Sequence, residues 1–431
     1  MISPCLSINE KGHLVISGCD TVELAERYGT PLYVMSEDEI RSVCRRYRSS
    51  FEEYYQGNGK ALYASKAFCC KEICRIVTEE GLDVEVVSGG ELYTALQAGI
   101  SPENIHFQGN NKTVSELEFA VNSGVGDIVV DNLSELYKLQ KIAAKQGTIV
   151  PISLRIKPGI DAHTHEFIRT GQIDSKFGID LTSGEALEAV KMAAGMREVS
   201  LRGLHCHVGS QIFEKEPFVH AAEVMLNFFA EIKQKLSVEF DFLNLGGGFG
   251  IHYVEEDDAI PYEEYMAAVS EAVHRKCGEL GLPLPKIYIE PGRSIVGEAG
   301  ITLYTVGNIL EIPTVRNYVS IDGGMYENPR YALYQAQYTC LIANKANQPA
   351  DYIATVTGKC CESGDLIQEH TSIQRPEEGD ILAVLSTGAY NYSMASNYNR
   401  NVRPACVMVS EGKSRIVIKG ETYDDLLRND I

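Results

Sequence analysis

Between residues 33 and 300, short apolar runs alternate regularly with longer amphipathic segments. Eight runs typical of strands begin near Ala61, Asp83, Asn104, Asp127, Ile149, Leu201, Phe240 and Lys286. Most are followed by a segment with helical periodicity. Strands of four to eight apolar residues that alternate with helices indicate βαβ units and a parallel sheet. Eight such units in ~250 residues predict a (β/α)8 barrel of the TIM type.

Capping signals mark the expected starts of several helices. A Ser, Thr or Asn is followed three residues later by Glu, the pattern of a capping box, in the pairs Ser88/Glu91, Thr113/Glu116, Asn132/Glu135 and Thr182/Glu185. Near the N-terminus, Asp20 is expected to cap a short helix that Gly29 ends. These signals strengthen the alternating pattern.

Beyond residue 300 the strand-like segments follow one another without helices between them. They are Ile301–Ile312, Val319–Asp322, Tyr352–Thr357, Asp380–Ser386 and Val407–Lys419. This pattern predicts a mostly antiparallel β domain. We expect residues 301–431 to form it, residues 1–32 to pack with it and complete it, and residues 33–300 to form the barrel.

The charge balance narrows the classes of partner. The chain has 59 acidic and 39 basic residues, and its net charge of −20 argues against binding to nucleic acid or to an anionic membrane. The first ten residues lack the pattern of a signal peptide, and no apolar run reaches membrane-spanning length. The 12 cysteines include no Cys-x-x-Cys pair. We therefore expect a reduced, cytoplasmic enzyme or small-molecule binder.

Polar or glycine-rich residues follow most of the predicted strands, at the barrel end where such folds carry their chemistry. In strand order they are Lys66, then Glu85 with Glu91, Arg155 with Lys157, His205 with His207, Gly246–Gly250, and Glu290 with Arg293. A long loop, Ile160–Lys176, follows the fifth strand. Packing alone does not require so many polar and glycine residues after the strands, so we expect a functional site at this end of the barrel.

Each of these signals has an ordinary explanation when it is taken alone. Lys66 could be a surface lysine, and the glycine run a flexible turn that lacks dinucleotide-binding spacing. His205 and His207 are spaced like metal ligands on a strand, but further ligands could only be guessed at His163 and His165, so no metal is expected. Together, a lysine, a glycine run, a histidine and a carboxylate fit pyridoxal 5′-phosphate (PLP).

Several motifs resemble those of the fold-type III PLP-dependent decarboxylases, which have an alanine-racemase-like barrel and a C-terminal β domain. They are residues 63–67, Lys176–Ile179, His205–Ile212, Gly246–Gly250 and Glu290–Arg293. The C-terminal motifs are similar to those of the diaminopimelate decarboxylase family, namely Asp322–Met325, Arg330–Tyr334, Cys361–Asp365 and Gly388–Asn399. The resemblance extends from about Thr21 to Pro404.

The resemblance implies roles for residues that would bind PLP. Lys66 would bind the cofactor covalently, His207 would stack on its ring and Ser210 would lie near its phosphate. Glu290 would pair with the pyridine nitrogen. The phosphate end would be held by Gly246, Gly247, Gly248 and Gly292, with Arg293 at that end or at a substrate carboxylate.

The resemblance also implies residues that would bind the substrate. Arg330 and Tyr334 would hold a substrate carboxylate, Glu362 an ammonium group, and Tyr390 would touch PLP or substrate. Cys361 would deliver the proton that replaces CO2. Cys361, Glu362 and Tyr390 are expected to come from the partner subunit, so the family implies a homodimer with active sites at the subunit interface.

Two positions depart from the family pattern. Glu85 stands where Asp is common, so an extra methylene must be accommodated near Lys66. Pro329 precedes Arg330, whereas Arg-Pro is the usual order, and this affects the aim of Arg330.

The resemblance implies PLP-dependent decarboxylation of meso-2,6-diaminopimelate to L-lysine and CO2, the last step of lysine biosynthesis. The alternative on the same scaffold is a decarboxylase of ornithine, arginine, lysine or carboxynorspermidine. An alanine racemase would need two opposed bases, and a non-catalytic homologue would be expected to lack Lys66 or Cys361. From another class, a metal-dependent barrel hydrolase would be built on His205 and His207.

Overall fold

The computed structural model describes residues 3–159 and 175–431, and the chain divides into two compact units. The barrel unit contains Val43–Gly250 and Ala259–Gly292. The β unit contains Met1–Ser42, Ile251–Asp258 and Arg293–Ile431. The β unit is thus assembled from three separate stretches of the chain. The domain limits expected from the sequence, 1–32, 33–300 and 301–431, stay a prediction.

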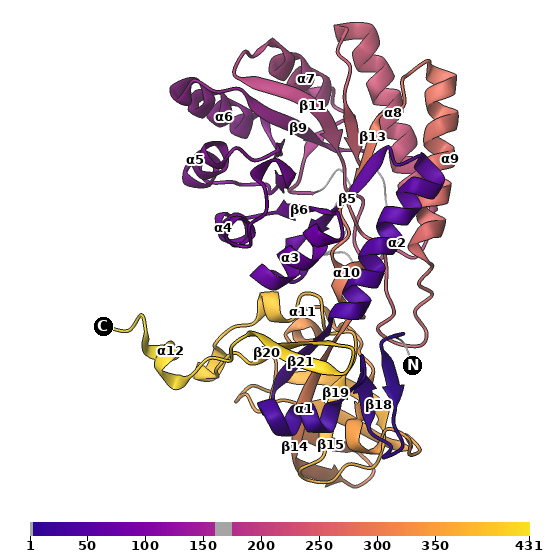
Figure 1. The fold of residues 1–431 in the computed structure, drawn as a ribbon, viewed down its shortest axis with the longest axis vertical. Helices are drawn as coiled ribbons and strands as arrows, with labels where there is room; N and C mark the ends of the chain where they lie inside the picture. Colours follow the sequence, from indigo (N-terminus) through magenta and orange to yellow (C-terminus); the bar gives the residue numbers. More distant parts are fainter. Residues whose placement is uncertain (1–2, 160–174) are drawn as a thin grey trace. The chain divides into compact units, whose positions relative to one another are not determined.

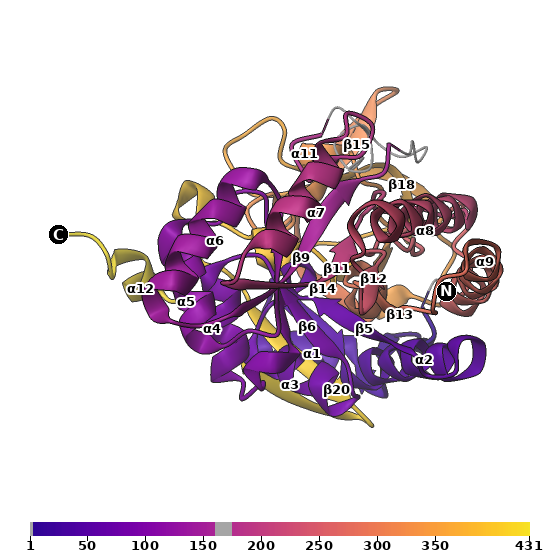
Figure 2. The same ribbon diagram turned by 90° about the horizontal axis from the view of Figure 1, so that it is seen from above.

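Eight parallel strands close the barrel, as the alternating pattern predicted (Figures 1 and 2). In chain order they are β5 (Gly59–Ala64), β6 (Asp83–Val86), β7 (Ile105–Phe107), β8 (Asp127–Val130), β9 (Val150–Lys157), β11 (Val199–His205), β12 (Phe242–Asn244) and β13 (Lys286–Ile289). Each pairs with the next, and β13 pairs with β5 to complete the ring. The two-residue strand β10 (Ile179–Asp180) adds to β9. The (β/α)8 prediction is confirmed.

Helices surround these strands in the view of Figure 2. They are α2 (Glu37–Tyr55), α3 (Lys71–Glu79), α4 (Gly89–Gln97), α5 (Val114–Ser123), α6 (Leu133–Gln146), α7 (Glu185–Gly195), α8 (Glu216–Leu236) and α9 (Tyr262–Leu280). Four of the strands, β6, β7, β8 and β12, are buried along their whole length, as expected for a parallel sheet that is covered by helices. No helix in the described part of the chain is both long and apolar enough to span a membrane.

Three of the four predicted helix caps in the barrel unit are confirmed. Ser88, Thr113 and Asn132 each accept a hydrogen bond from the backbone N–H three residues on. The prediction at Thr182 is wrong, because α7 begins after Gly184, which has φ +83°. Thr182 instead donates its hydroxyl to the Asp180 carboxylate, a charged acceptor that competes with the helix end.

The β unit is built on a mostly antiparallel sheet with strand order β18-β17-β15-β14-β4-β20-β21. The strands are β4 (Leu32–Ser36), β14 (Gly300–Ile312), β15 (Arg316–Ile321), β17 (Tyr352–Thr357), β18 (Leu366–Ile373), β20 (Ala405–Ser410) and β21 (Lys413–Ile418), with β16 (Cys340–Ile342) and β19 (Ile381–Val384) beside β14. The single strand predicted over Val407–Lys419 is wrong. It is a hairpin that turns at Glu411 and Gly412, both at positive φ.

The N-terminal segment completes this unit, as expected. Strands β1 (Leu6–Ile8), β2 (Leu14–Ile16) and β3 (Cys19–Asp20) form a small sheet, followed by α1 (Thr21–Tyr28). Asp20 caps α1 and Gly29 ends it. Strand β4 then lies inside the large sheet, antiparallel to β14 and parallel to β20. A segment from the start of the chain thereby joins strands from its last third.

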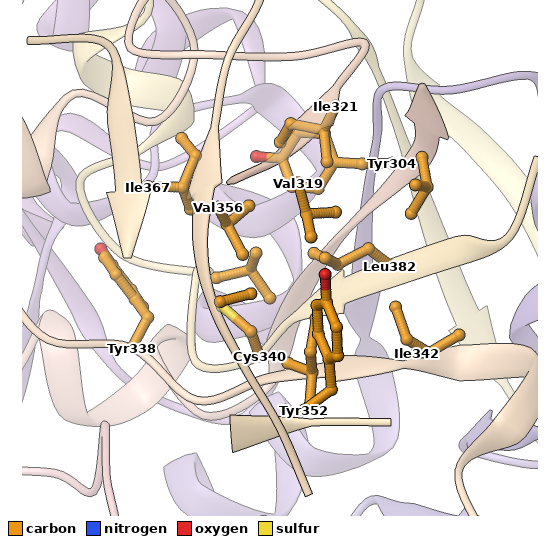
Figure 3. Close-up of a cluster of buried hydrophobic side chains, with 14 of the residues drawn as sticks. Tyr304, Val319, Ile321, Tyr338, Cys340, Ile342, Tyr352, Val356, Ile367 and Leu382 are labelled. Carbon is orange, nitrogen blue, oxygen red and sulfur yellow. The ribbon is translucent and has the colours of Figure 1, made fainter. Parts of the chain in front are cut away.

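A cluster of aromatic and β-branched side chains fills one core of the β unit (Figure 3). Strands β14, β15, β17 and β18 supply most of it, including Tyr304, Val319 and Tyr352. Ile251 and Tyr253 join it from the stretch Ile251–Asp258, which directly follows the glycine run of the barrel. This core fixes side chains that matter for the site described next.

Candidate active site

Lys66 lies just beyond β5, in a single turn of 3-10 helix over Ser65–Ala67. Its neighbour Ser65 donates a hydrogen bond of 2.9 Å to Glu91, and the Val87 N–H donates one of 2.8 Å to the same carboxylate oxygen. The turn is therefore tied to the start of α4. The Lys66 Nζ lies 3.6 Å from Glu85 Oε1, and its side chain is 43% exposed. The amine is anchored at its base and accessible at its tip.

Glu85 is the last but one residue of β6 and is fully buried. Neither of its carboxylate oxygens accepts a hydrogen bond from the described residues. Burial raises the pKa of Glu85 to about 7, although the nearby Lys66 charge opposes the shift. The longer side chain at this position is thus accommodated inside the barrel, with its carboxylate beside Lys66.

Glu290 follows β13 and is held by three donors. The Asn244 amide donates to its Oε1 at 2.7 Å, the Gln108 amide donates to the same oxygen, and His205 Nε2 lies 3.2 Å from Oε2. Burial alone would raise the pKa of Glu290, but the His205 ring and the Lys66 charge outweigh it, and the pKa falls to about 2. The barrel unit therefore keeps a buried carboxylate ionised at neutral pH.

His205 belongs to this carboxylate cluster. Its ring is fully buried, burial lowers its pKa below the usual value, and its Nδ1 accepts or donates no hydrogen bond within the described chain. Across residues 3–159 and 175–431, no three His, Cys, Asp or Glu side chains are placed to hold a metal ion. His163, His165 and most of the loop Ile160–Lys176 lie outside the described residues.

The glycine run after β12 packs against the neighbouring strand ends. Gly246 has φ +70°, and a Cβ there would lie 2.7 Å from His207 Nδ1. A Cβ on Gly247 would lie 2.1 Å from the Glu290 carbonyl oxygen. The Gly247 N–H donates to His207 Nδ1 at 3.2 Å, and burial lowers the pKa of His207 well below its usual value. The run thus fixes a neutral imidazole.

Residues 176–179 brace the fifth strand. The Gly178 N–H donates to an Asp131 carboxylate oxygen at 3.0 Å, and the Arg155 guanidinium lies 4.4 Å from the centre of the Phe177 ring. Gly178 has φ +78°, and a Cβ there would lie 3.2 Å from the Arg155 carbonyl oxygen. This segment therefore fixes a buried arginine whose charge acts on Glu85 and Glu290.

A second group of site candidates lies within the β unit. Arg293 begins the short helix α10 (Arg293–Val296), donates a 2.5 Å hydrogen bond to the Tyr253 hydroxyl, and lies 4.7 Å from the centre of the Tyr390 ring. Arg330 begins α11 (Arg330–Tyr334) and donates to the Tyr338 hydroxyl at 2.8 Å. The structure brings Arg293, Arg330 and Tyr390 into one cluster with two tyrosines.

The residue order Pro329-Arg330 fits a helix start. Pro329 is the N-cap of α11 with φ −84°, a value that the proline ring permits, and Arg330 takes the first helical position. Arg330 is 8% exposed, its guanidinium donates to a phenol, and within the described chain it forms no ion pair with a carboxylate. A buried guanidinium is costly unless an anion reaches it. This arrangement is suited to binding one.

Tyr390 adopts the left-handed conformation, with φ +66°. For a bulky residue such a φ costs on the order of 1–3 kcal/mol, and it persists where the surroundings enforce it. The next residue, Asn391, is fully buried and donates a 3.2 Å hydrogen bond to the Thr387 carbonyl. The turn is thereby held, and the Tyr390 ring lies beside Arg293.

Cys361 and Glu362 lie in the turn between β17 and β18, and both are exposed. The Cys361 N–H donates to the Asn399 side-chain oxygen at 2.8 Å. Among the described residues, Cys361 is the one exposed cysteine, while Cys69 and Cys70 are half-buried. Tyr334, at the end of α11, is also half-buried. Exposure leaves the Cys361 thiol accessible to another chain.

Sequence reasoning missed four residues of these clusters, namely Gln108, Asn244, Tyr253 and Tyr338. Gln108 and Asn244 had a readable signal, because each is a polar residue at or just beyond the end of a strand. The two tyrosines had none. Each stands in an unremarkable polar context, and only the fold brings it to an arginine.

Comparison of the sequence with those of known proteins identifies the family. The family model described as "Pyridoxal-dependent decarboxylase, pyridoxal binding domain" matches residues 37–297. Diaminopimelate decarboxylase of Bacillus methanolicus is 49% identical over 96% of this chain and 95% of its own length. That of Bacillus subtilis is 47% identical over 98% and 96%. This chain belongs to the diaminopimelate decarboxylase family.

A solved member of the diaminopimelate decarboxylase family has the same fold. The crystal structure of the M. jannaschii enzyme in complex with L-lysine matches with a TM-score of 0.94 and 35% identity, over 100% of this chain and 98% of that one. The chain is a PLP-dependent decarboxylase, and PLP is its cofactor.

The side chains of the barrel unit fit PLP chemically. An accessible amine at Lys66 can bind the cofactor aldehyde, and the ionised carboxylate of Glu290 can stabilise a protonated pyridine nitrogen. The neutral His207 ring can stack without adding charge. The two buried oxygens of Glu85, which accept no hydrogen bond from the described residues, leave room for a donor beside Lys66.

Proposed function

We propose that this enzyme decarboxylates meso-2,6-diaminopimelate at its D-centre to give L-lysine and CO2, the last step of lysine biosynthesis. The observation that carries the proposal is Arg330, a buried guanidinium that contacts a tyrosine hydroxyl and has no carboxylate partner in the described chain. A diaminopimelate molecule has a second carboxylate at its far end, and a guanidinium binds carboxylates in a bidentate manner. The names of the relatives point to the same substrate.

The cofactor roles follow the family pattern. Lys66 binds PLP covalently, His207 stacks on its ring, and Glu290 pairs with the pyridine nitrogen. The phosphate end is held by Ser210, Gly246, Gly247, Gly248, Gly292 and Arg293, and Tyr390 also touches the cofactor. When bound, PLP withdraws electrons from the substrate Cα and so makes loss of CO2 possible.

The remaining roles concern substrate and proton. Arg330 and Tyr334 hold the distal carboxylate, Glu362 binds the distal ammonium, and Arg293 and Tyr390 complete the substrate site. Cys361 donates a proton to Cα after CO2 has left, because a thiol can act as a general acid. Each role is one that the chemical type of the side chain permits.

Two further features belong to the proposal. The enzyme is a homodimer in which Cys361, Glu362 and Tyr390 serve the active site of the other subunit. The exposure of Cys361 and Glu362 supports this arrangement. The enzyme is cytoplasmic, in keeping with its 12 free cysteines.

The second candidate is a decarboxylase of ornithine, arginine, lysine or carboxynorspermidine on the same scaffold. A diamine-forming enzyme needs an acid for the distal ammonium of its substrate but no distal arginine. The buried Arg330 therefore favours diaminopimelate.

An absorbance spectrum and a product assay test the cofactor and the substrate together. Purified enzyme is expected to show the visible band of lysine-bound PLP, and to release CO2 and L-lysine from meso-diaminopimelate. Lys66→Ala should lose the band and at least about 1,000-fold in activity, because covalent cofactor binding and its proton transfers disappear together. A band without turnover would redirect the assay to ornithine and carboxynorspermidine. No band after addition of PLP would overturn the cofactor assignment of Lys66.

Mixing two inactive variants tests the shared active sites. Lys66→Ala and Cys361→Ala are each expected to be inactive as homodimers. After exchange of subunits, mixed dimers contain one site with both native residues, so activity should return. If the mixture stayed inactive while subunit exchange was verified by mass, Cys361 would not serve the other subunit.

A further inference from the structure

Two arginines of the β unit lie over one tyrosine ring. The Arg330 guanidinium carbon is 5.0 Å from the centre of the Tyr253 ring, and that of Arg293 is 5.7 Å from it. These distances are within the range of cation–π attraction. The Tyr253 hydroxyl also accepts the 2.5 Å hydrogen bond from Arg293. One tyrosine thus contacts both of the guanidiniums that the proposed function assigns to anions.

A second tyrosine holds Arg330. The Tyr338 hydroxyl accepts the 2.8 Å hydrogen bond from Arg330, and the guanidinium lies 5.8 Å from the centre of its ring. The groups that hold Arg330 are therefore neutral. A phenol orients a guanidinium without cancelling its charge, whereas a carboxylate would do both.

The core of the β unit fixes both tyrosines. Their rings meet edge to face, with centres 5.4 Å apart and an interplanar angle of 87°. Both belong to the cluster of Figure 3, in which Tyr338 is drawn. The Tyr253 carbonyl accepts hydrogen bonds from the backbone and side chain of Thr339, and Asn391 donates to the Tyr338 hydroxyl at 3.4 Å. The two hydroxyls are thus presented by a rigid base.

We propose that Tyr253 and Tyr338 are positioning residues that orient the guanidiniums of Arg293 and Arg330 toward the carboxylates of the substrate. The inference rests on the proposed function and deepens it. The tyrosine hydroxyl oxygens orient both guanidiniums, and at Arg330, where the contacting groups are neutral, the charge remains available to the substrate. Neither tyrosine needs to touch the substrate, since each acts through an arginine.

Tyrosine-to-phenylalanine variants of the PLP-loaded enzyme test this role. Tyr253→Phe and Tyr338→Phe keep the ring and remove the hydroxyl. Each is expected to raise KM for meso-diaminopimelate about tenfold and to leave kcat within about twofold, because an oriented arginine contributes to substrate binding. The affinity for pimelate, a seven-carbon dicarboxylate without amino groups, should fall by the same factor in a direct binding titration.

Tyr352→Phe is the matched control. Tyr352 belongs to the same core, but its hydroxyl donates to Glu311 at 3.0 Å rather than accepting from an arginine. This variant loses one phenol hydrogen bond from the same cluster and should change neither KM nor the affinity for pimelate. Its melting temperature shows how much stability is lost when a phenol hydroxyl is removed from this core without any effect on an arginine.

The outcomes separate the role of the tyrosines from the proposed function. Unchanged KM and pimelate affinity in Tyr253→Phe and Tyr338→Phe would overturn the inference, as would equal effects in Tyr352→Phe. If one variant fails to fold, the other decides. A wild-type enzyme that did not turn over diaminopimelate would defeat the proposed function, while the comparison of pimelate affinities would still decide the role of the tyrosines.

Discussion

Glu290 in the barrel unit and Arg330 in the β unit are both buried charges, but the protein treats them in opposite ways. Glu290 receives hydrogen bonds from Gln108 and Asn244 and contacts His205, and its pKa falls to about 2. Arg330 has a phenol and two rings around it and no carboxylate in the described chain. The charge of Glu290 is stabilised by hydrogen bonds within its unit, whereas the charge of Arg330 is suited to binding an anion from outside the chain.

The difference corresponds to the ligand that each charge would contact, the cofactor for Glu290 and the substrate for Arg330. A cofactor that stays bound can rely on a carboxylate that the fold has already stabilised, because that charge must persist through every cycle. A substrate enters and leaves, so an arginine that binds it should have no carboxylate partner within the protein that would compete with the substrate. The cost of leaving Arg330 unpaired is a loss of stability, which function can outweigh.

Glu290→Gln is expected to have the largest effect. Removal of the carboxylate should lower kcat about 100- to 1,000-fold, the usual cost of losing a preorganised charge. The folded pKa of Glu290, about 2, lies below its ordinary value of 4.5, so its contribution to stability is present above pH 4.5 and is lost as pH falls toward 2. Apo Glu290→Gln should melt lower than wild type at pH 7, and this difference should shrink in acid.

The control for this change is Glu263→Gln. Glu263 pairs with Arg46 at 2.7 Å on the barrel unit, where the pair is partly exposed. Loss of that pair should alter activity little and stability by less than about 1 kcal/mol. A Glu290→Gln enzyme that kept activity within about tenfold of wild type would contradict the assignment of Glu290 to the pyridine nitrogen.

Arg330→Met is expected to have the next largest effect on activity. Unlike Glu290→Gln, it should not lower the stability of the protein. KM for meso-diaminopimelate should rise about 10- to 100-fold, since a charge-assisted carboxylate contact is lost. The melting temperature of the apo-protein should stay the same or rise, because an uncompensated buried charge has been replaced by an apolar side chain. Arg330→Lys should recover only part of the affinity, since lysine lacks the planar fork.

Arg316→Met is the contrasting arginine in the same unit. Arg316 pairs with Glu369 at 2.8 Å, and both side chains are 29% exposed. Its removal should lower the melting temperature slightly and leave KM unchanged. If Arg330→Met were destabilised as much as Arg316→Met, the contrast between satisfied and unsatisfied charges would not hold.

Glu85→Gln is expected to have the smallest effect, confined to the pH dependence of stability. The folded pKa of Glu85, about 7, lies above its ordinary value of 4.5, so ionisation between these pH values favours the unfolded chain. Apo wild type should therefore lose stability relative to Glu85→Gln as pH rises from about 4.5 to 7, and the gap should then stay constant. Urea unfolding at pH 4.5 and pH 7.5 measures it, and a gap independent of pH would contradict the raised pKa.

Much of the barrel could be predicted because its signals are local. Each strand is a short apolar run, and the chemistry follows the strand ends, so Lys66, His207 and Glu290 could be found in order along the chain. Their contacts could not be found this way. Gln108 reaches Glu290 across 182 positions of sequence, and nothing near Gln108 indicates that partner.

The β unit was less predictable because its strands pair over longer distances. Strand β4 is a five-residue apolar run that looks like a barrel strand, yet it pairs with β14 and β20. The turn at Glu411 and Gly412 lies inside a region of strong β propensity and was missed. No sequence signal distinguishes Tyr253, and only the packing of Ile251–Asp258 into the β unit gives it a role.

The β unit is made of three separate stretches of the chain, and this limits how the enzyme can be divided or recombined. A gene fragment that ends at residue 292 would encode the barrel together with Ile251 and Tyr253, whose apolar surfaces belong to the core of the missing unit. A fragment that begins at residue 293 would lack β4, an interior strand of its sheet. Exchange of the β unit between relatives therefore requires three segments to be transplanted together, and a chimera made by a single crossover should be recovered as insoluble protein.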